Sequence, residues 1–397
     1  MVDYTKIYLL NIDVQKLLKS TKLDFKSQIS KSTGEINESV FIAKYHFCEI
    51  TIQTIKEEGK PERTHVFFIG SIHKMWNELN GIKAPNYDEK KLYKGFNGNL
   101  FTLNDIVEVR THLEDLFDCK ASQMIFQNIE FGVNIILDYN PILFIKGLLY
   151  RQNIMFEFSH RGNTSKVIYC NYLLKIYSKS YQYGMAENVI RIELKTLKMD
   201  GLKDKHIPID INTFEDINEN TLDQVSKLLI KRFNEIRHYD YSIDKKKLTE
   251  RKLNALRDYS NPRYWINDLE SNERDRYLKR LDIITTKFSK KRFQKIGIDI
   301  EKMCSTINRL FDNNPREEIN KKCSTINRVF ENPFCSTVNP LDKELNIIQN
   351  TLKKEIENES KNDEVAKPFS SSYQNQKKTI AKYNRLAVQN YNVKYNL

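Results

Sequence analysis

Several short segments in the first 200 residues alternate between apolar and polar side chains, and this pattern constrains the fold more than any other feature. The clearest is IEFGVNI at residues 129–135, in which large apolar residues alternate with Glu130, Gly132 and Asn134. The segments VIRIELK and LLKIYSK alternate in the same way. Because successive side chains of a strand point to opposite faces, each segment predicts a strand with one apolar and one polar face.

The order of such patterns predicts an α+β domain over residues 1–205, with an antiparallel sheet and helices packed on one face. Strands are expected at residues 6–14, 41–57, 64–74, 124–137 and 188–198, with a hairpin over 154–179. Residues 19–40 are rich in Lys, Ser and Thr and are expected to form a loop. Thr102 and Asp105 form a capping-box-like pair at the start of a helix, and Asn140-Pro141 opens a second, short helix.

The second half of the chain changes character. Residues 206–310 hold Lys-rich helical patterns with interleaved aromatic residues, which predict a mainly helical domain that either binds DNA or packs on the first domain as an accessory. Residues 311–397 are expected to form a repeat-containing segment and a flexible basic tail. The repeats begin at Cys304, Cys323 and Cys335, and their cysteines are too scattered to suggest a metal site.

Composition narrows the class of protein. The 397 residues carry a formal net charge of +12, which favours a polyanionic partner such as DNA but also fits a basic, solvated surface. No signal peptide is evident at the start, and no run of about 18 apolar residues predicts a membrane span. Six cysteines without CxxC pairs are typical of a reducing compartment, so we expect a cytoplasmic protein.

The alternation also predicts a polar site, provided that the strands are neighbours. One face would then gather His73, Glu130, Tyr177, Lys179, Arg191 and Glu193. Two carboxylates and an imidazole suit a hard divalent ion such as Mg²⁺ or Mn²⁺. Tyr177 could act as a nucleophile if a nearby cation such as Lys179 lowered the cost of its ionisation. Each of these residues, taken alone, also fits an ordinary structural role.

Four stretches in order resemble the replication initiators of the filamentous-phage gene-two type and the similar rolling-circle Rep nickases of small bacterial plasmids. The first is GSIHKMWN followed by KGFNGNLFTLNDI, which is similar to the family's small-residue strand and its Gly-x-Asn-x-Phe loop before a helix. NIEFGVNI is similar to its strand with a hydrophobic-acidic pair, LLKIYSKSYQY to its Tyr-x-Lys segment, and VIRIELKTLK to its Arg-x-Glu strand. The resemblance covers residues 65–205, a little over a third of the chain.

The resemblance implies a nuclease domain that nicks one strand of origin DNA, forms a phosphotyrosyl linkage through Tyr177 and later rejoins the strand. It also implies a dependence on Mg²⁺ or Mn²⁺, for which Glu130 and Glu193, with His73 from the shared strand face, are the expected ligands. The implied partners are double-stranded origin DNA, the displaced single strand, and a bacterial host's helicase and polymerase. Many related nucleases carry a His-hydrophobe-His metal motif, and no such pair occurs in this sequence.

Two questions stay open at the level of sequence. Tyr181 follows Tyr177 by four residues, so the two hydroxyls would share a face of a helix but would lie far apart along a strand. The β-rich segment LLKIY favours a single catalytic tyrosine, Tyr177. The chain could also be a plasmid relaxase or a transposase with the same chemistry, or a non-catalytic protein that only binds origin DNA.

Overall fold

A computed structural model describes residues 2–82 and 100–308 of the chain, apart from residues 30–33, 35, 57 and 60. All the described residues belong to one compact unit, Met1–Glu331. The predicted segment 311–397, with the repeats that begin at Cys323 and Cys335, lies outside the described residues. None of the described helices is both long and apolar enough to cross a membrane.

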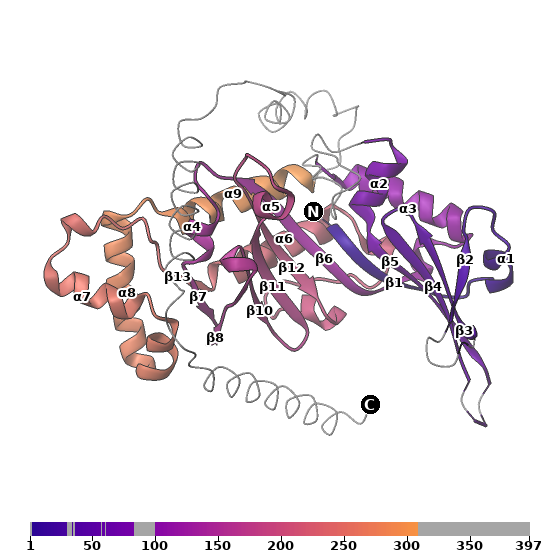
Figure 1. The fold of residues 1–397 in the computed structure, drawn as a ribbon, viewed down its shortest axis with the longest axis horizontal. Coiled ribbons are helices and arrows are strands. Elements are labelled where there is room, and N and C mark those ends of the chain that lie inside the picture. Colours follow the sequence, from indigo (N-terminus) through magenta and orange to yellow (C-terminus); the bar gives the residue numbers. More distant parts are fainter. Residues whose placement is uncertain are drawn as a thin grey trace, which may run out of the picture. The chain divides into compact units, whose positions relative to one another are not determined.

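The predicted α+β fold with a large antiparallel sheet is confirmed (Figure 1). Within the described residues, ten strands form one sheet in which every neighbouring pair is antiparallel. In spatial order they are β2 (Phe25–Ile29), β3 (Ile36–Tyr45), β4 (Cys48–Ile55), β5 (Arg63–Ser71), β1 (Val2–Leu9), β6 (Met124–Ile136), β12 (Val189–Thr196), β11 (Tyr172–Ser178), β10 (Thr164–Ile168) and β9 (Glu157–Ser159). The strands with the clearest alternation, β6, β12 and β11, are direct neighbours in the middle of the sheet.

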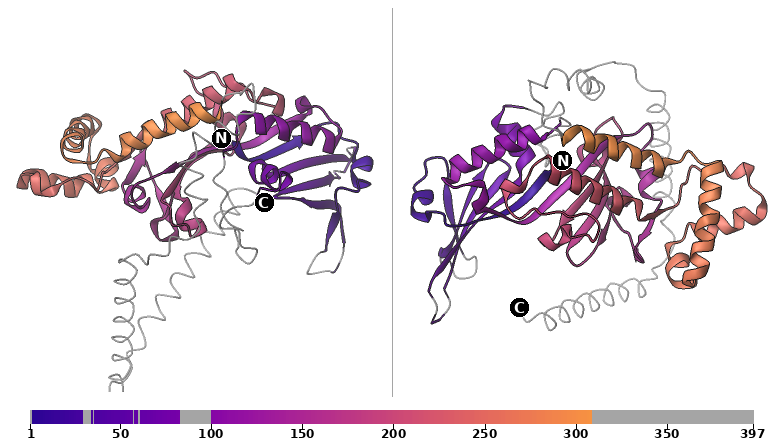
Figure 2. Two further views of the ribbon diagram at one scale, coloured as in Figure 1. Left: turned by 90° about the horizontal axis from the view of Figure 1, so that it is seen from above. Right: turned by 180° about the vertical axis from the view of Figure 1, so that it is seen from behind.

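Helices cover one face of this sheet, as Figure 2 shows from above. They are α2 (Ile72–Leu79), α3 (Leu103–Phe117), α6 (Glu219–Asn234) and α9 (Arg292–Ile307), whose apolar side chains form one hydrophobic core with the sheet. The shorter helices are α1 (Val14–Leu18), α4 (Ile142–Ile145) and α5 (Lys179–Tyr183). We call the opposite face, which carries Lys6, Phe67, Glu130 and Glu193, the open face of the sheet.

A smaller, mainly helical lobe has a hydrophobic core of its own around Trp265. It contains α7 (Glu250–Tyr259), a π-helical turn at Tyr264–Asp268 and α8 (Ser271–Phe288), and it packs on Leu149 and Tyr150. These two residues belong to a second sheet, made of β13 (Ile236–His238), β7 (Leu148–Arg151) and β8 (Ile154–Met155). The predicted helical character of the second half is therefore confirmed.

The expected boundary at residue 205 does not separate two hydrophobic cores. Helices α6 and α9 follow it in sequence but pack on the same core as the sheet, and Cys304, where the first repeat begins, is buried there in α9. Among the residues that the structure describes, only the lobe around α7 and α8 has a separate core. The sheet domain thus recruits helices from both halves of the chain.

Some predicted elements are wrong in their limits. The expected loop at residues 19–40 contains β2 and the start of β3, and the expected single strand at 41–57 is two strands joined by a turn at His46, whose φ is +52°. The strand expected at 64–74 ends at Ser71, because the Ser71 side chain accepts a hydrogen bond from the Lys74 backbone N–H and so caps α2. The helix predicted at 102–117 and its capping box are present as α3.

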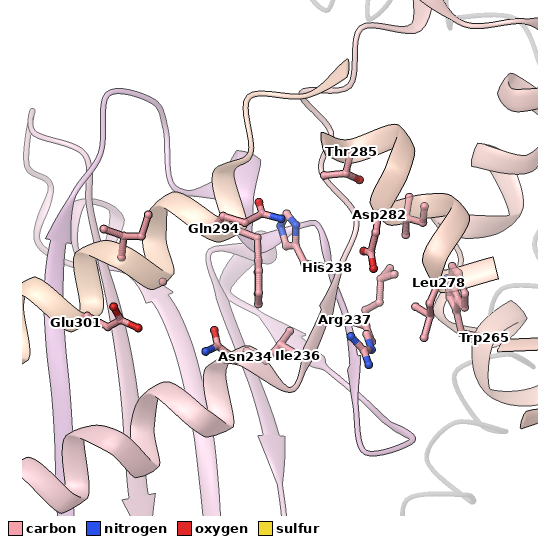
Figure 3. Close-up of a pocket in the computed structure, with 15 residues that line it drawn as sticks. Asn234, Ile236, Arg237, His238, Trp265, Leu278, Asp282, Thr285, Gln294 and Glu301 are labelled. Atoms are coloured by element: carbon pink, nitrogen blue, oxygen red, sulfur yellow. The ribbon is translucent and has the colours of Figure 1, made fainter. Parts of the chain in front are cut away.

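A cavity of about 420 Å³ lies between β13, α8 and α9, at the junction of the two cores (Figure 3). Its lining includes His238, Trp265, Asp282 and Gln294. None of the residues predicted to be catalytic or metal-binding lines this cavity. Of the residues predicted to form the site, Glu130, Tyr177 and Glu193 lie elsewhere, in the strands of the large sheet.

Candidate active site

The pairing of the central strands brings the predicted polar residues of β6, β11 and β12 together. In the register of the sheet, Lys195 lies opposite Glu130 and Tyr177 lies opposite Arg191. Side chains at opposed positions of an antiparallel pair point to the same face. Glu130, Tyr177, Arg191 and Glu193 therefore share the open face, as the alternation predicts.

A β-bulge in β1 adds an acidic residue that the sequence pattern did not predict, Asp3. Val2 pairs with Phe131 and Thr5 with Ile129, so β1 has one extra residue between these two pairs. Both Asp3 and Tyr4 lie opposite Glu130 as a result, and both reach the open face. A bulge re-aims side chains locally in this way.

The Arg191 guanidinium connects the carboxylates of three strands. Its Nε donates to Glu193 Oε2 at 3.0 Å, and its Nη2 lies 3.2 Å from Asp3 Oδ2 and 3.9 Å from Glu130 Oε1. Its side chain is 7% exposed. A Cβ at Gly132 would lie only 3.0 Å from the guanidinium carbon and 2.9 Å from the Ile192 carbonyl oxygen, so glycine leaves the space in which this group sits.

Glu130 and Glu193 lie close enough for each carboxyl to shift the pKa of the other. Burial raises the pKa of Glu130 well above its usual range, and the negative charges of Glu193 and Asp3 raise it further. Burial acts in the same direction on Glu193, but the Arg191 and Lys175 cations outweigh it and hold the pKa of Glu193 below its usual value. Of the two carboxyls, Glu130 therefore binds a proton more readily and Glu193 less readily, as expected for two close carboxyls with one cation beside them.

Tyr177 donates a hydrogen bond from its hydroxyl to Glu193 Oε2 at 3.0 Å. The side chain is buried, with 6% of its surface exposed. Burial raises the pKa of the Tyr177 phenol well above 10, and the charge of Glu193 raises it further. The hydroxyl is thus held on a carboxylate that can accept its proton, although the phenol stays protonated at neutral pH.

Two lysines flank the Tyr177 ring. The Lys175 Nζ lies 4.3 Å from the ring centroid and 3.8 Å from Glu193 Oε1, and the Lys179 Nζ lies 5.1 Å from the centroid. Burial, helped by the Arg191 charge, lowers the pKa of Lys179 to about 7. Lys179 can therefore change its charge near neutral pH, whereas Lys175 is a second cation that the prediction did not include.

His73 does not share the strand face on which it was expected. The strand β5 ends at Ser71, so His73 lies in the first turn of α2, where its ring stacks on Phe101 with a centroid separation of 4.7 Å. It remains near Asp3. Burial would raise the pKa of Asp3, but the charges of Arg191, His73 and Lys179 outweigh burial and lower it.

Across the residues that the structure describes, no group of three or more His, Cys, Asp and Glu side chains is arranged to hold a metal ion. The three carboxylates near Arg191 are nevertheless the donor type that Mg²⁺ and Mn²⁺ prefer. Burial and neighbouring negative charge raise the pKa of Glu130, and a divalent cation beside Glu130 and Glu193 could neutralise this charge in place of a proton. The donor types fit such an ion, whereas in this structure the three carboxylates are paired with Arg191.

Tyr181 lies apart from the carboxylates. The chain leaves β11 at Ser178, and Tyr181 belongs to α5, with 51% of its side chain exposed. Its backbone N–H donates to the capping Ser178 Oγ at 3.1 Å. The segment is therefore a strand up to Ser178 and a helix from Lys179. Of the two tyrosines, only Tyr177 donates a hydrogen bond from its hydroxyl to Glu193.

No protein-family model matches the chain, and no curated protein matches its sequence closely. Among solved structures, the chain is similar to a rolling circle replication initiator protein from Geobacillus stearothermophilus. The two are 13% identical, the match covers 66% of this chain and 96% of that chain, and the TM-score is 0.24. At so low a TM-score the likeness does not establish a shared fold.

Proposed function

We propose that the chain is a rolling-circle replication initiator that nicks one strand of origin DNA through Tyr177. The observation that carries this proposal is the hydrogen bond from the Tyr177 hydroxyl to Glu193, inside a cluster of three carboxylates and Arg191 on the open face. The Tyr-x-Lys and Arg-x-Glu stretches that resemble the initiator family supply these residues. A module that only binds DNA needs no buried phenol on a carboxylate.

The chemistry follows from the groups present. The Tyr177 oxygen would attack the scissile phosphorus while Glu193 accepts the phenolic proton. A new bond would form between that oxygen and phosphorus, and the bond from phosphorus to the 3′ oxygen would break. The 3′ oxygen would take up one proton from water and leave as a free 3′-OH, which a host polymerase could extend once a helicase has opened the duplex. Attack of a 3′-OH on the phosphotyrosine would rejoin the strand.

We propose Mg²⁺ or Mn²⁺ as the cofactor, held by Glu130 and Glu193 with Asp3 or His73 as further donors. Such an ion would polarise the phosphate and offset the charge of the transition state. The chain's own residues have separate roles. Arg191 orients the carboxylates, and Lys175 and Lys179 supply positive charge beside Tyr177. Glu193 accepts the proton of the Tyr177 phenol. The high pKa of Tyr177 means that these cations are needed for the phenolate to form.

A relaxase or a transposase would use the same cluster, and a non-catalytic origin-binding protein would not need it. The deciding experiment incubates the purified chain with the supercoiled replicon that carries its gene, with and without Mg²⁺. We expect a nicked circle with protein attached to the 5′ end at the nick. Tyr177→Phe should abolish nicking, and Tyr181→Phe, the matched control four residues away, should leave it intact.

Each outcome has one meaning. Nicking that survives Tyr177→Phe but not Tyr181→Phe would move the nucleophile to α5 and overturn the assignment. Failure of the wild-type chain to nick its own replicon in Mg²⁺ or Mn²⁺, with binding retained, would favour the non-catalytic protein. Nicking without a covalent product would refute the tyrosine mechanism and point to hydrolysis.

A further inference from the structure

Three aromatic side chains lie together on the open face, away from the carboxylate cluster. Tyr8 of β1 is the register partner of Phe67 of β5, with ring centroids 5.6 Å apart, and His65 lies two residues before Phe67 on the same face. The His65 ring is 5.4 Å from Tyr8 and stacks beside Phe67 at 6.2 Å with an interplanar angle of 19°. We call these three residues the aromatic platform.

The hydrophobic core does not account for the aromatic platform. The residues next to its members in sequence, such as Ile7, Val66 and Phe68, point to the other face and are buried. The described helices near this half of the sheet pack there too, since Phe117 of α3 contacts Phe68 and Leu17 of α1 is part of the core. The platform rings are half-buried and face away from these helices. An antiparallel sheet can leave one face to water, but that face is normally polar.

Positive charge accompanies the rings. The Lys6 Nζ lies 4.8 Å from the Phe67 ring centroid, and the Lys195 Nζ lies 4.1 Å from the Tyr4 ring centroid. Lys195 is also 3.9 Å from Glu130 Oε2, so it joins this side of the sheet to the carboxylate cluster. On the neighbouring strand β4, the acidic Glu49 is already paired with Lys44. Lys6 and Lys195 therefore supply positive charge for phosphate groups on the platform side of the carboxylate cluster.

The spacing fits a polymer that continues from the active site. Across the sheet, the consecutive strands β12, β6, β1 and β5 put three intervals of about 4.8 Å, roughly 14 Å, between Glu193 and Phe67. Along the strands, Glu193 lies opposite Gly132 of β6, whereas Tyr8, the partner of Phe67, lies opposite Ile125, so about seven residues at about 3.3 Å each add roughly 23 Å. The two sites are therefore roughly 27 Å apart, which is a span of several nucleotides of single-stranded DNA. Bases stacked on the platform would thus belong to the same strand as a phosphate placed at Tyr177.

We propose that the aromatic platform binds the single-stranded DNA next to the nick by stacking its bases on Tyr8, Phe67 and His65, while Lys6 and Lys195 hold its phosphates. Every base has a flat face, so such stacking tolerates any sequence. Duplex DNA cannot use the platform in this way, because its base faces are covered by neighbouring base pairs. The proposal rests on the proposed function only for the position of the scissile phosphate.

The test measures binding of a fluorescent oligothymidylate of about 15 nucleotides to the full chain, in EDTA so that no cleavage occurs. Stacking on one aromatic residue contributes about 5- to 150-fold in affinity. Tyr8→Leu and Phe67→Leu, which keep apolar volume but remove the ring, should each weaken binding at least fivefold. Tyr8→Phe keeps the ring and should bind like the wild type, and Tyr241→Leu, a half-exposed tyrosine of the other lobe, is the matched control.

The outcomes separate this proposal from the nickase. Unchanged oligothymidylate affinity in both leucine variants, with unchanged melting temperatures, would overturn the platform even if Tyr177-dependent nicking is found. An equal loss of affinity for an abasic strand or for duplex DNA would also overturn it, because the surface would then act by charge alone. Selective loss for the single strand would support the platform even if the chain proved not to nick. A leucine variant that does not fold is replaced by Tyr8→Ile or Phe67→Met, judged by the same two criteria.

Discussion

Replacing Arg191 by methionine tests whether one guanidinium holds the acidic cluster together. Methionine keeps an apolar stem but removes the charge and the donors that lie 3.0 Å from Glu193, 3.2 Å from Asp3 and 3.9 Å from Glu130. Removing one partner of a buried ion pair costs about 3–5 kcal/mol. Since two ionised carboxylates lose their counter-charge here, we expect a loss near the upper end, about 5 kcal/mol in the free energy of unfolding at pH 7.

The pH dependence makes this prediction specific. Asp3 and Glu193 have lowered pKa values in the folded chain, so their ion pairs stabilise the fold above the unfolded pKa of about 4 and this contribution is lost as the pH falls. In Arg191→Met the cause of the lowering is gone and the buried carboxyls bind protons readily. The penalty of the substitution should therefore be largest at pH 7 and shrink toward pH 4.

The assay is urea unfolding followed by the fluorescence of Trp76, which packs on the sheet core, in a background where Trp265 is replaced by phenylalanine. The exposed Arg263→Met is the matched control and should change stability by less than about 0.5 kcal/mol. Adding Glu193→Gln to Arg191→Met should recover part of the loss. A loss below about 1 kcal/mol at pH 7, or a loss that does not vary with pH, would refute the account of Arg191.

The remaining predictions concern single side chains. Burial lowers the pKa of His238 to about 4, so the free energy of unfolding of the wild type should decrease as the pH falls from 6.5 to 4. In urea unfolding, His238→Gln should remove much of this decrease, whereas the control His206→Gln, at an exposed position, should not. Gly132→Ala should destabilise the fold by about 1–3 kcal/mol in the same assay and reduce nicking, since its Cβ would press on the Arg191 guanidinium. Lys179→Met should abolish nicking while raising stability at pH 7. Because the folded pKa of about 7 lies below the unfolded value of 10.5, this gain should shrink as the pH rises toward 10.5, and a gain that does not vary with pH would contradict the lowered pKa of the buried amine.

The part of the site that the sequence predicted is the part that depends on strand geometry alone. Glu130 and Glu193 and their apolar neighbours alternate in β6 and β12, and the structure places both carboxyls on one face. Side chains alternate between the two faces of any extended backbone, so this prediction does not require knowing which strands are neighbours. Neighbouring positions in the sheet were an assumption, and the register of β6, β12 and β11 satisfies it.

The limits of elements were less predictable, because they depend on caps and turns. His73 was assigned to a strand because SIH continues the alternation of the preceding residues. The Ser71 side chain caps a helix at this point instead, and the next apolar residues, Met75 and Trp76, then follow helical spacing and are buried. The residues after Ser71 fit both strand alternation and helical spacing, so the sequence alone does not distinguish a strand from a helix here. The burial of Met75 and Trp76 against the core favours the helix.

Asp3 was missed for a stronger reason. Its position has the same parity as Thr5, Ile7 and Leu9, which are buried, so a regular strand would place its carboxylate in the hydrophobic core. The bulge opposite Glu130 removes this conflict by turning Asp3 to the open face, where Arg191 and Ser71 bind it. An aspartate with the parity of a core face is therefore itself a signal, since an unpaired buried carboxylate is too costly to persist. The strand had to break its alternation at that point, and in this chain the break supplies the third carboxylate of the proposed active site.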